Sequence, residues 1–321
     1  MLLFIVVDHI PSCIQWSYAI YINVQGSQMK IENILVIADQ QDKQQSALAH
    51  AKSLVKHTGA KIHIVAFHYE HLTTLVTKLN KEQQLDIQNK IISLGEKWLK
   101  SEITHVKLQE KSTMEVVWEK DIVEWIKKHC TSQSYDLIIK TGHRSEGPFY
   151  VPTDWHLIRN NLVPTLLVAE KKWRKKQSVM VSLDLGTHLT SKQALNQQLL
   201  DAGITFATNT NMPLHICYSL PISSVLKDLR IIDKKALVND AKSRYLPIIE
   251  SMLGEYEIPL ANIHFKAGPA SKVIPSVASK HAAGLVIMGS IGRKGLKAKL
   301  MGNTAESVLA LLKTDILVIQ P

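Results

Sequence analysis

The sequence is poor in cysteine, glycine, proline and aromatic residues. Its 321 residues include 3 cysteines, none in a CxxC spacing, which excludes a disulfide framework and a zinc ribbon and favours a reducing compartment, the cytoplasm. The 14 glycines and 11 prolines are too few for a collagen-like or low-complexity chain. Aromatic residues at 6% provide no stacking platform for single-stranded nucleic acid.

A long apolar run is also missing. The segment Leu2–Val7 is apolar but ends at Asp8, far short of the roughly 20 residues that cross a bilayer, so no stable membrane insertion is expected. No basic residue precedes Lys30, whereas a secretory signal requires one. A strand-like run follows Met29 at once, so we expect residues 1–28 to be a poorly ordered N-terminal extension. A membrane or targeting element is the alternative.

Charge and length give two further expectations. The chain has 38 Lys and Arg against 28 Asp and Glu, a formal charge of +10, which favours anionic partners such as nucleotides without choosing among them. At 321 residues it is about twice the common domain size, so two domains are expected.

The sequence contains the same pattern twice. Short β-branched runs alternate with longer amphipathic stretches, as in βα units around a parallel sheet. Four strand-like runs recur in the same order at an offset of about 150 residues, which indicates a tandem duplication. The matching runs are Ile34–Asp39 with Val179–Asp184, Ile62–Val65 with Leu214–Cys217, Leu137–Lys140 with Leu285–Met288, and Thr165–Val168 with Asp315–Val318.

Each copy is predicted to hold five strands and about four helices in a doubly wound α/β sheet. Continuous apolar strands fit a parallel sheet that is buried on both faces. The predicted helices are Gln44–Thr58, Leu79–Ser101, Met114–His129, Lys192–Thr208, Lys234–Leu253, Lys272–His281 and Asn303–Leu312.

The two predicted domains span residues 29–170 and 178–321, hereafter the first and second repeat. Between them residues 171–177 form a basic linker, which is either a solvated joint or a patch for phosphates, with nucleic-acid binding the less favoured use.

The strongest local motif follows the fourth strand of the second repeat. Gly289 and Gly292 end an apolar run, nine residues intervene, and Gly302 precedes a predicted helix. Glycine N–H groups and a helix N-terminus together suit a phosphate, and glycine lets it approach the backbone closely. A glycine-rich turn followed by an ordinary N-cap is the alternative.

An aspartate stands at the matching place after the first strand of this repeat. Ligands of open parallel sheets bind beyond the carboxyl ends of the strands, where the strand order reverses. Asp184 ends the first strand and Gly289 the fourth, so both are expected to face one crevice. The Asp184 carboxylate could accept a hydrogen bond from an adenine amino group or a sugar hydroxyl, or it could cap the following helix.

The Gly-x2-Gly-x9-Gly spacing, the aspartate and the closing strand resemble the universal stress protein family. The tandem layout, with Pro152–Leu157 in the first copy and Gly302–Glu306 in the second, is similar to its bacterial E-type tandem members. The resemblance covers about residues 29–321. It implies strand order 3-2-1-4-5 in each repeat, an intramolecular pseudo-dimer paired through the last strands, and ATP in the crevice.

Carried over residue by residue, the resemblance implies a nucleotide site in the second repeat. Asp184 would meet adenine, the backbone around Ser219 would line the base pocket, and the glycine motif would hold ribose and phosphates. Asn303 departs from the Ser or Thr usual in ATP binders, and Thr304 would supply the hydroxyl one residue later. The candidate residues are Asp184, Ser219, Met288, Gly289, Gly292, Arg293, Gly302, Asn303 and Thr304.

The first repeat keeps Asp39 but has a shorter and bulkier loop, so we predict that it has lost phosphate binding. Lys140 stands where the second repeat has Met288. It is either a surface residue or a buried cation paired with Asp39 or Asp154, since a buried lysine needs a partner.

No set of residues indicates a catalytic or metal centre. His63, His68 and His71 could bind zinc, but scattered surface histidines are the simpler interpretation. Trp98, Trp118 and Trp125 are expected in the core or at a domain interface. Nothing resembles a nucleophile elbow or a Walker lysine.

The sequence therefore predicts a cytoplasmic stress-response protein that binds an adenine nucleotide, with Mg²⁺, in its second repeat. It is not a dedicated enzyme, and any ATP hydrolysis would be slow because no general base is evident. The alternative is a binder of a larger apolar or nucleotide-linked ligand, or of a protein partner, with the glycine motif serving as scaffold.

Overall fold

The structure is a computed structural model that describes residues 29–70, 79–142, 153–160, 163–169, 177–222, 233–290 and 303–321. The predicted extension 1–28 and the basic run 171–176 lie outside the described residues. The boundaries of the predicted domains therefore stay predictions.

Each repeat contains five strands joined through helices. The first repeat consists of β1 (Asn33–Ile37), α2 (Ser46–Thr58), β2 (Lys61–His68), α4 (Lys81–His105), β3 (Ser112–Trp118), α5 (Ile122–Ser132), β4 (Leu137–Thr141), α6 (Thr153–Asn160) and β5 (Thr165–Val168). The second consists of β6 (Ser178–Leu183), α7 (Thr190–Thr210), β7 (Leu214–Leu220), α9 (Lys234–Leu253), β8 (Ile263–Ala267), α10 (Ala270–Lys280), β9 (Ala283–Gly289), α11 (Asn303–Leu311) and β10 (Asp315–Ile319).

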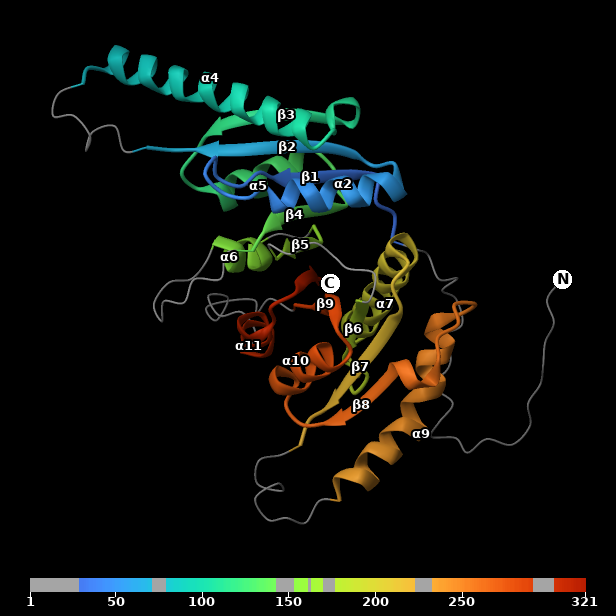
Figure 1. The fold of residues 1–321 in the computed structure, drawn as a ribbon. Coiled ribbons are helices and arrows are strands. Elements are labelled where there is room, and N and C mark those ends of the chain that lie inside the picture. Colours follow the sequence, from blue (N-terminus) through green and yellow to red (C-terminus); the bar gives the residue numbers. More distant parts are fainter. Residues whose placement is uncertain are drawn as a thin grey trace.

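The strands form one ten-stranded sheet in the order β3-β2-β1-β4-β5-β10-β9-β6-β7-β8. Each half has the order 3-2-1-4-5 and is parallel throughout, so the expected fold class and strand order are confirmed. β5 and β10 pair antiparallel, with Leu166 opposite Leu317. The carboxyl ends of the strands therefore point in opposite directions in the two repeats, which occupy the upper and lower halves of Figure 1.

Helices cover both faces of the sheet, and the central strands are apolar because both of their faces are buried. One core runs across both repeats beneath α2, α4, α7 and α9, and the opposite face packs under α5 and α6 in the first repeat and α10 and α11 in the second (Figure 1). Fully buried members of the shared core include Leu48, Leu54, Leu99, Leu200, Phe206 and Ile249.

The predicted helix Met114–His129 is wrong in its first half. Residues Ser112–Trp118 form the edge strand β3, which pairs in parallel with β2, and the helix α5 begins only at Ile122. β-Branched Val116 and Val117 suit a strand. The boundary is set by Asp121, whose side chain caps α5 by accepting a 3.0 Å hydrogen bond from the N–H of Glu124. The other predicted helices match observed ones to within a turn.

Two of the three tryptophans considered in the first repeat pack against its core. Trp98 is half-buried against the shared core, and Trp125 packs edge-on to Phe67 at 5.1 Å and stacks on His129 at 4.3 Å between ring centroids. Trp118 contacts Tyr69 at 5.8 Å. The expectation that these residues belong to the core is confirmed for Trp98 and Trp125.

A close contact between α7 and the sheet gives a testable prediction about packing. A Cβ atom on Gly203 would lie 2.3 Å from Cγ2 of Val181 and 3.2 Å from Cδ1 of Leu214, both buried. We expect Gly203→Val to lower the free energy of unfolding by about 1–3 kcal/mol through overpacking, measured by urea denaturation followed by circular dichroism. Val181→Ala in the same chain should recover part of this loss. Additive losses in the double variant would contradict the contact.

Candidate functional site

The candidate site lies at the carboxyl ends of β6 and β9 in the second repeat. These strands are neighbours, with Ser182 opposite Met288, so Asp184 and Gly289 follow at adjacent strand ends. The chain leaves β6 toward β7 on one side, whereas β9 and β10 lie on the other, so the strand order reverses here. This is where open parallel sheets bind ligands.

The backbone of Asp184 is fixed while its side chain faces solvent. Its N–H donates to Oδ1 of Asn196 and its carbonyl accepts from Nδ2 of Asn196, both at 2.9 Å. The side chain is 59% exposed, and its carboxylate lies 3.4 Å from the Lys192 ammonium. The N-cap of α7 is Leu189, so the alternative role of Asp184 as a helix cap is wrong. The carboxylate is thus accessible to solvent at the end of β6.

Ser219 and Tyr218 mark the end of β7. The Ser219 hydroxyl donates to the carbonyl of Gly268 at 2.8 Å and so ties the ends of β7 and β8 together. Tyr218 is buried edge-on against Tyr245 and Phe265, with ring centroids at 5.2 and 6.1 Å. Burial raises the pKa of Tyr218 above its usual range, with Tyr245 and Asp184 adding to the effect, so the phenol stays neutral.

The sequence did not single out Tyr218 as a site residue. The available signal was its position directly before Ser219 at the end of a predicted strand. Its hydroxyl lies beside Gly186, where an added Cβ atom would be 2.7 Å from the phenol oxygen. The loop after Asp184 therefore packs against the Tyr218 side chain at Gly186.

Gly289 is closely packed against α7. A Cβ atom there would lie 2.7 Å from Cδ2 of Leu195 on α7. The next residue, Ser290, donates its N–H to the carbonyl of Ile319 at 2.9 Å, so that N–H belongs to the sheet. The Met288 side chain is buried in the core under α10 and α11, so Met288 can offer a ligand only its backbone.

The phosphate end of the predicted site is only partly described. Gly292, Arg293 and Gly302 lie outside the described residues. Asn303 and Thr304 begin α11, as predicted, but their side chains also lie outside the description. The phosphate-binding role of these residues stays a prediction.

The corresponding place in the first repeat is filled by its own side chains. Asp39 is buried, and its carboxylate accepts a 2.7 Å hydrogen bond from the Thr141 hydroxyl. Lys140 is buried as well, and its ammonium lies 2.7 Å from the Asp154 carboxylate. Of the two alternatives for Lys140, the buried cation with a partner is confirmed. Gln45 holds the backbone of Asp39 as Asn196 holds that of Asp184.

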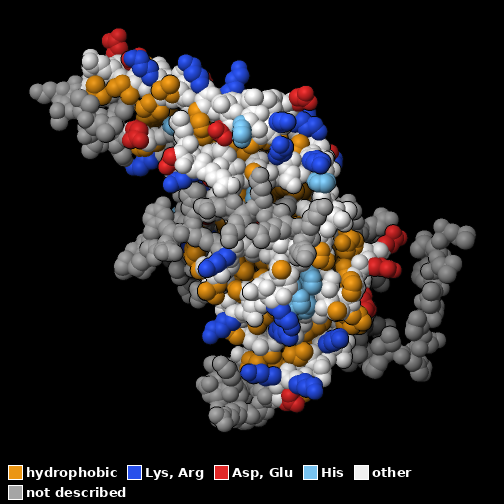
Figure 2. Space-filling model, in the orientation of Figure 1, with side chains coloured by type: hydrophobic (Ala, Val, Ile, Leu, Met, Phe, Trp, Pro, Cys, Tyr) orange, Lys and Arg blue, Asp and Glu red, His pale blue; other side chains and the backbone are white. Residues whose placement is uncertain are grey.

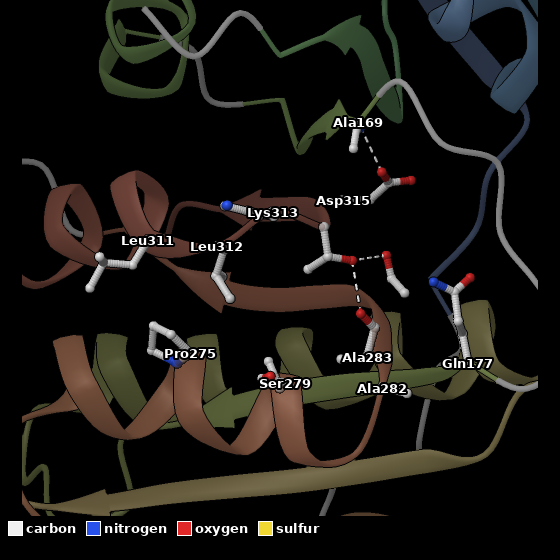
Figure 3. Close-up of a pocket in the computed structure, with 13 residues that line it drawn as sticks. Ala169, Gln177, Pro275, Ser279, Ala282, Ala283, Leu311, Leu312, Lys313 and Asp315 are labelled. Carbon is white, nitrogen blue, oxygen red and sulfur yellow. Dashed lines mark hydrogen bonds between the residues drawn. The ribbon is translucent and has the colours of Figure 1, made fainter. Parts of the chain in front are cut away.

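The seam between the repeats contains a second polar cluster and a cavity of about 340 Å³ (Figure 3). Asp315 is 1% exposed; one carboxylate oxygen accepts from the N–H of Ala169 at 2.6 Å and the other lies 3.0 Å from Nε2 of His50. The Thr314 hydroxyl donates to the carbonyls of Ala283, at 2.9 Å, and Gly284. Asp315 therefore connects the two repeats, whereas Thr314 bonds within the second repeat.

The histidines considered for zinc in the first repeat do not converge. Nδ1 of His63 lies 2.8 Å from the Thr113 hydroxyl, and the His63 ring stacks on His129 at 5.3 Å. His68 packs edge-on to Trp98 at 6.5 Å, and His71 lies outside the described residues. Burial lowers the pKa values of His63 and His68.

A sequence-family comparison decides the family. The model of the universal stress protein family matches residues 30–168 and 190–320. The chain belongs to the universal stress protein family. The tandem organisation expected from the sequence is confirmed, and the stress-response family assignment follows from it.

Relatives of the same length support this assignment. The chain is 28% identical to universal stress protein E of Salmonella typhi over 297 residues, which cover 90% of this chain and 94% of the relative. It is 28% identical over 307 residues to the universal stress protein E homolog of Haemophilus influenzae, covering 91% and 98%. The similarity to the E-type members is thus confirmed.

The fold also matches a solved structure. A universal stress protein from Pseudomonas aeruginosa UCBPP-PA14 superposes with a TM-score of 0.67 at 22% identity, covering 91% of this chain and 94% of that one. Within the described residues, no helix has both the length and the apolar character needed to cross a membrane.

Proposed function

We propose that the second repeat binds an adenine nucleotide, ATP with Mg²⁺, and that the chain is a cytoplasmic binding protein of the stress response and not a dedicated enzyme. One contrast carries this proposal. The aspartate after the first strand is exposed in the second repeat, as Asp184, but buried in the first, as Asp39. A ligand can replace Lys192 as the partner of the exposed Asp184 carboxylate. The Asp39 carboxylate, in contrast, already accepts a hydrogen bond from Thr141 inside the protein.

The chemistry of the crevice suits the two ends of a nucleotide. The Asp184 carboxylate would accept a hydrogen bond from the adenine amino group or a ribose hydroxyl, and the backbone around Ser219 would line the base. At the other end, Gly292, Gly302 and the N-terminus of α11 would place N–H groups around the phosphates, with Arg293 supplying positive charge. These groups stabilise phosphate charge but offer no general base, so any hydrolysis should be slow.

Isothermal titration of the full chain with ATP and Mg²⁺ tests the proposal. We expect one site, and we expect Asp184→Ala to weaken binding about 10- to 100-fold because a hydrogen bond to a carboxylate is worth about 1.5–3 kcal/mol. The fold should not change, since exposed ion pairs contribute at most about 1 kcal/mol. Asp240→Ala is the matched control: this carboxylate is 66% exposed and pairs with Arg244 at 3.3 Å on α9.

Absence of heat with the folded wild-type chain would overturn the proposal, as would equal binding by the Asp184→Ala and Asp240→Ala variants. The alternative, a larger apolar ligand or a protein partner with the glycine motif as scaffold, is favoured by one observation: Gly289 is needed for packing against Leu195 without any ligand. Mass spectrometry of ligands that copurify with the chain separates the two, since an adenine nucleotide supports the first and a lipid the second.

A further inference from the structure

Three histidines of the second repeat converge at a place remote from the nucleotide crevice. His215 and His264 are the second residues of β7 and β8, and His281 directly follows α10. Both strands therefore contribute residues near their amino ends, whereas Asp184, Ser219 and Gly289 lie at carboxyl ends. In Figure 2, histidine side chains gather on the surface of this repeat among basic ones.

The ring nitrogens are close to the spacing that a metal requires. One ligand atom from each histidine lies within 4.8 Å of the other two. Nδ1 of His215 is 2.9 Å from Nε2 of His264, and the ring of His264 stacks on that of His281 with centroids 4.1 Å apart. Zinc binds imidazole nitrogen at about 2.0–2.1 Å in tetrahedral geometry, which puts two such nitrogens about 3.3 Å apart. The three nitrogens would have to move closer by side-chain rotation to surround one ion at that distance.

The backbone around the cluster is already fixed. β7 and β8 pair in parallel, with Cys217 opposite His264. His281 ends α10: its N–H donates to the carbonyl of Val277 at 3.0 Å, and its carbonyl accepts from the Ser178 hydroxyl at 2.9 Å. A ligand set on fixed backbone loses little freedom when the metal binds.

The electrostatic environment of the cluster both favours and opposes metal binding. Burial, with the two neighbouring histidines and nearby lysines, lowers the pKa of His264 to about 4, and burial also lowers that of His215. Neutral imidazole is the form that binds metal. Against this, Lys266, Lys272 and Lys280 line the adjoining groove, and their charge opposes a cation. The expected affinity is therefore below that of a structural zinc site.

The first repeat shows what the same strands look like without such a cluster. His63 is the counterpart of His215, but its neighbours on β3 are the Thr113 hydroxyl at 2.8 Å and the Glu115 carboxylate at 3.7 Å. Its third neighbour, His129, is engaged with the Tyr135 hydroxyl at 3.0 Å. Among the residues that the structure describes, the cluster of three imidazoles is found in the second repeat.

We propose that His215, His264 and His281 bind one divalent transition metal ion, Zn²⁺, with water in the fourth position. Three imidazoles and an open position are a ligand set that zinc accepts. The site is independent of the proposed nucleotide site, which lies at the opposite ends of the strands.

Competition titration tests this site. The full chain without a histidine tag is stripped with EDTA, dialysed, and titrated with zinc chloride near neutral pH against a chromophoric chelator. We expect one Zn²⁺ per chain, and weakening of about ten-fold or more in His264→Gln and in His281→Gln. The His63→Gln variant, altered at the matching strand position of the first repeat, should bind as the wild type does.

Cobalt provides a second readout that a purely structural role would not produce. Co²⁺ should give the intense visible absorption of a tetrahedral site in the wild type, lost in His281→Gln. His281 is only half-buried and is held by backbone hydrogen bonds, so this variant should fold, which circular dichroism checks. Absence of one-to-one zinc binding, or binding unchanged in both cluster variants, would overturn the proposal.

Discussion

Replacing Lys140 by methionine is expected to lower the free energy of unfolding of the first repeat by about 3–5 kcal/mol, because it leaves the buried Asp154 carboxylate without its cation. The ammonium of Lys140 lies 2.7 Å from that carboxylate, and the two side chains are 11% and 4% exposed. The second repeat has a buried methionine, Met288, at the position that corresponds to Lys140. We therefore expect the fold to accommodate a methionine side chain at this strand position.

Tryptophan fluorescence during urea denaturation measures this effect in the intact chain. Of the six tryptophans, four lie in the first repeat, Trp16 and Trp173 lie outside both repeats, and none lies in the second, so the second repeat contributes no tryptophan signal. The matched variant is Lys140→Met with Asp154→Asn, which removes both charges together and should recover most of the loss. If Lys140→Met alone costs less than about 1 kcal/mol, the ion pair is a minor contributor.

Replacing Asp315 by alanine is expected to cost a similar amount, about 3–5 kcal/mol, and to uncouple the repeats. One of its carboxylate oxygens accepts a 2.6 Å hydrogen bond from the N–H of Ala169, and the other lies 3.0 Å from Nε2 of His50, both in the first repeat. Alanine would remove both contacts and would leave the N–H of Ala169 without this acceptor. Scanning calorimetry should then show a lower midpoint and two separated transitions in place of a more cooperative one.

Two variants show whether this loss comes from the seam. Asp315→Asn keeps an acceptor for Ala169 and should lose less than Asp315→Ala. Asp136→Ala removes a carboxylate that also accepts two backbone N–H groups, from Glu32 and Asn33 at 2.8 Å, but within the first repeat. It should leave the coupling intact. Equal calorimetric profiles for Asp136→Ala and Asp315→Ala would show that Asp315 has no special role between the repeats.

Most of the fold was visible in the sequence because buried parallel strands need continuous apolar runs. The runs beginning at Ile34, Ile62, Leu137 and Thr165 each became a strand, and so did their four counterparts. The third strand of the first repeat was wrongly predicted as helix. Only a short polar turn separates Val116 and Val117 from the apolar residues of α5, so the two elements look like one apolar stretch in the sequence. The cap at Asp121 that separates the two elements depends on a side-chain rotamer.

The candidate site was predictable only in part. The positions of Asp184 and Gly289 follow from strand order, which local pattern alone does not determine. That Lys140 pairs with Asp154, not with Asp39, depends on side-chain packing. The histidine cluster was missed for the same reason, since His215, His264 and His281 are far apart in the chain and meet only after β7, β8 and α10 have packed.

The antiparallel pair β5 and β10 joins two halves that are no longer identical. In a two-fold symmetric dimer of separate chains, every residue at the contact would occur twice, so a buried carboxylate would come with a second copy, and each copy would need its own basic partner. In this chain the position of Asp315 on β10 corresponds to Thr165 on β5. A single Asp315 therefore meets a single His50, and covalent connection lets each face of the contact specialise without requiring self-complementarity.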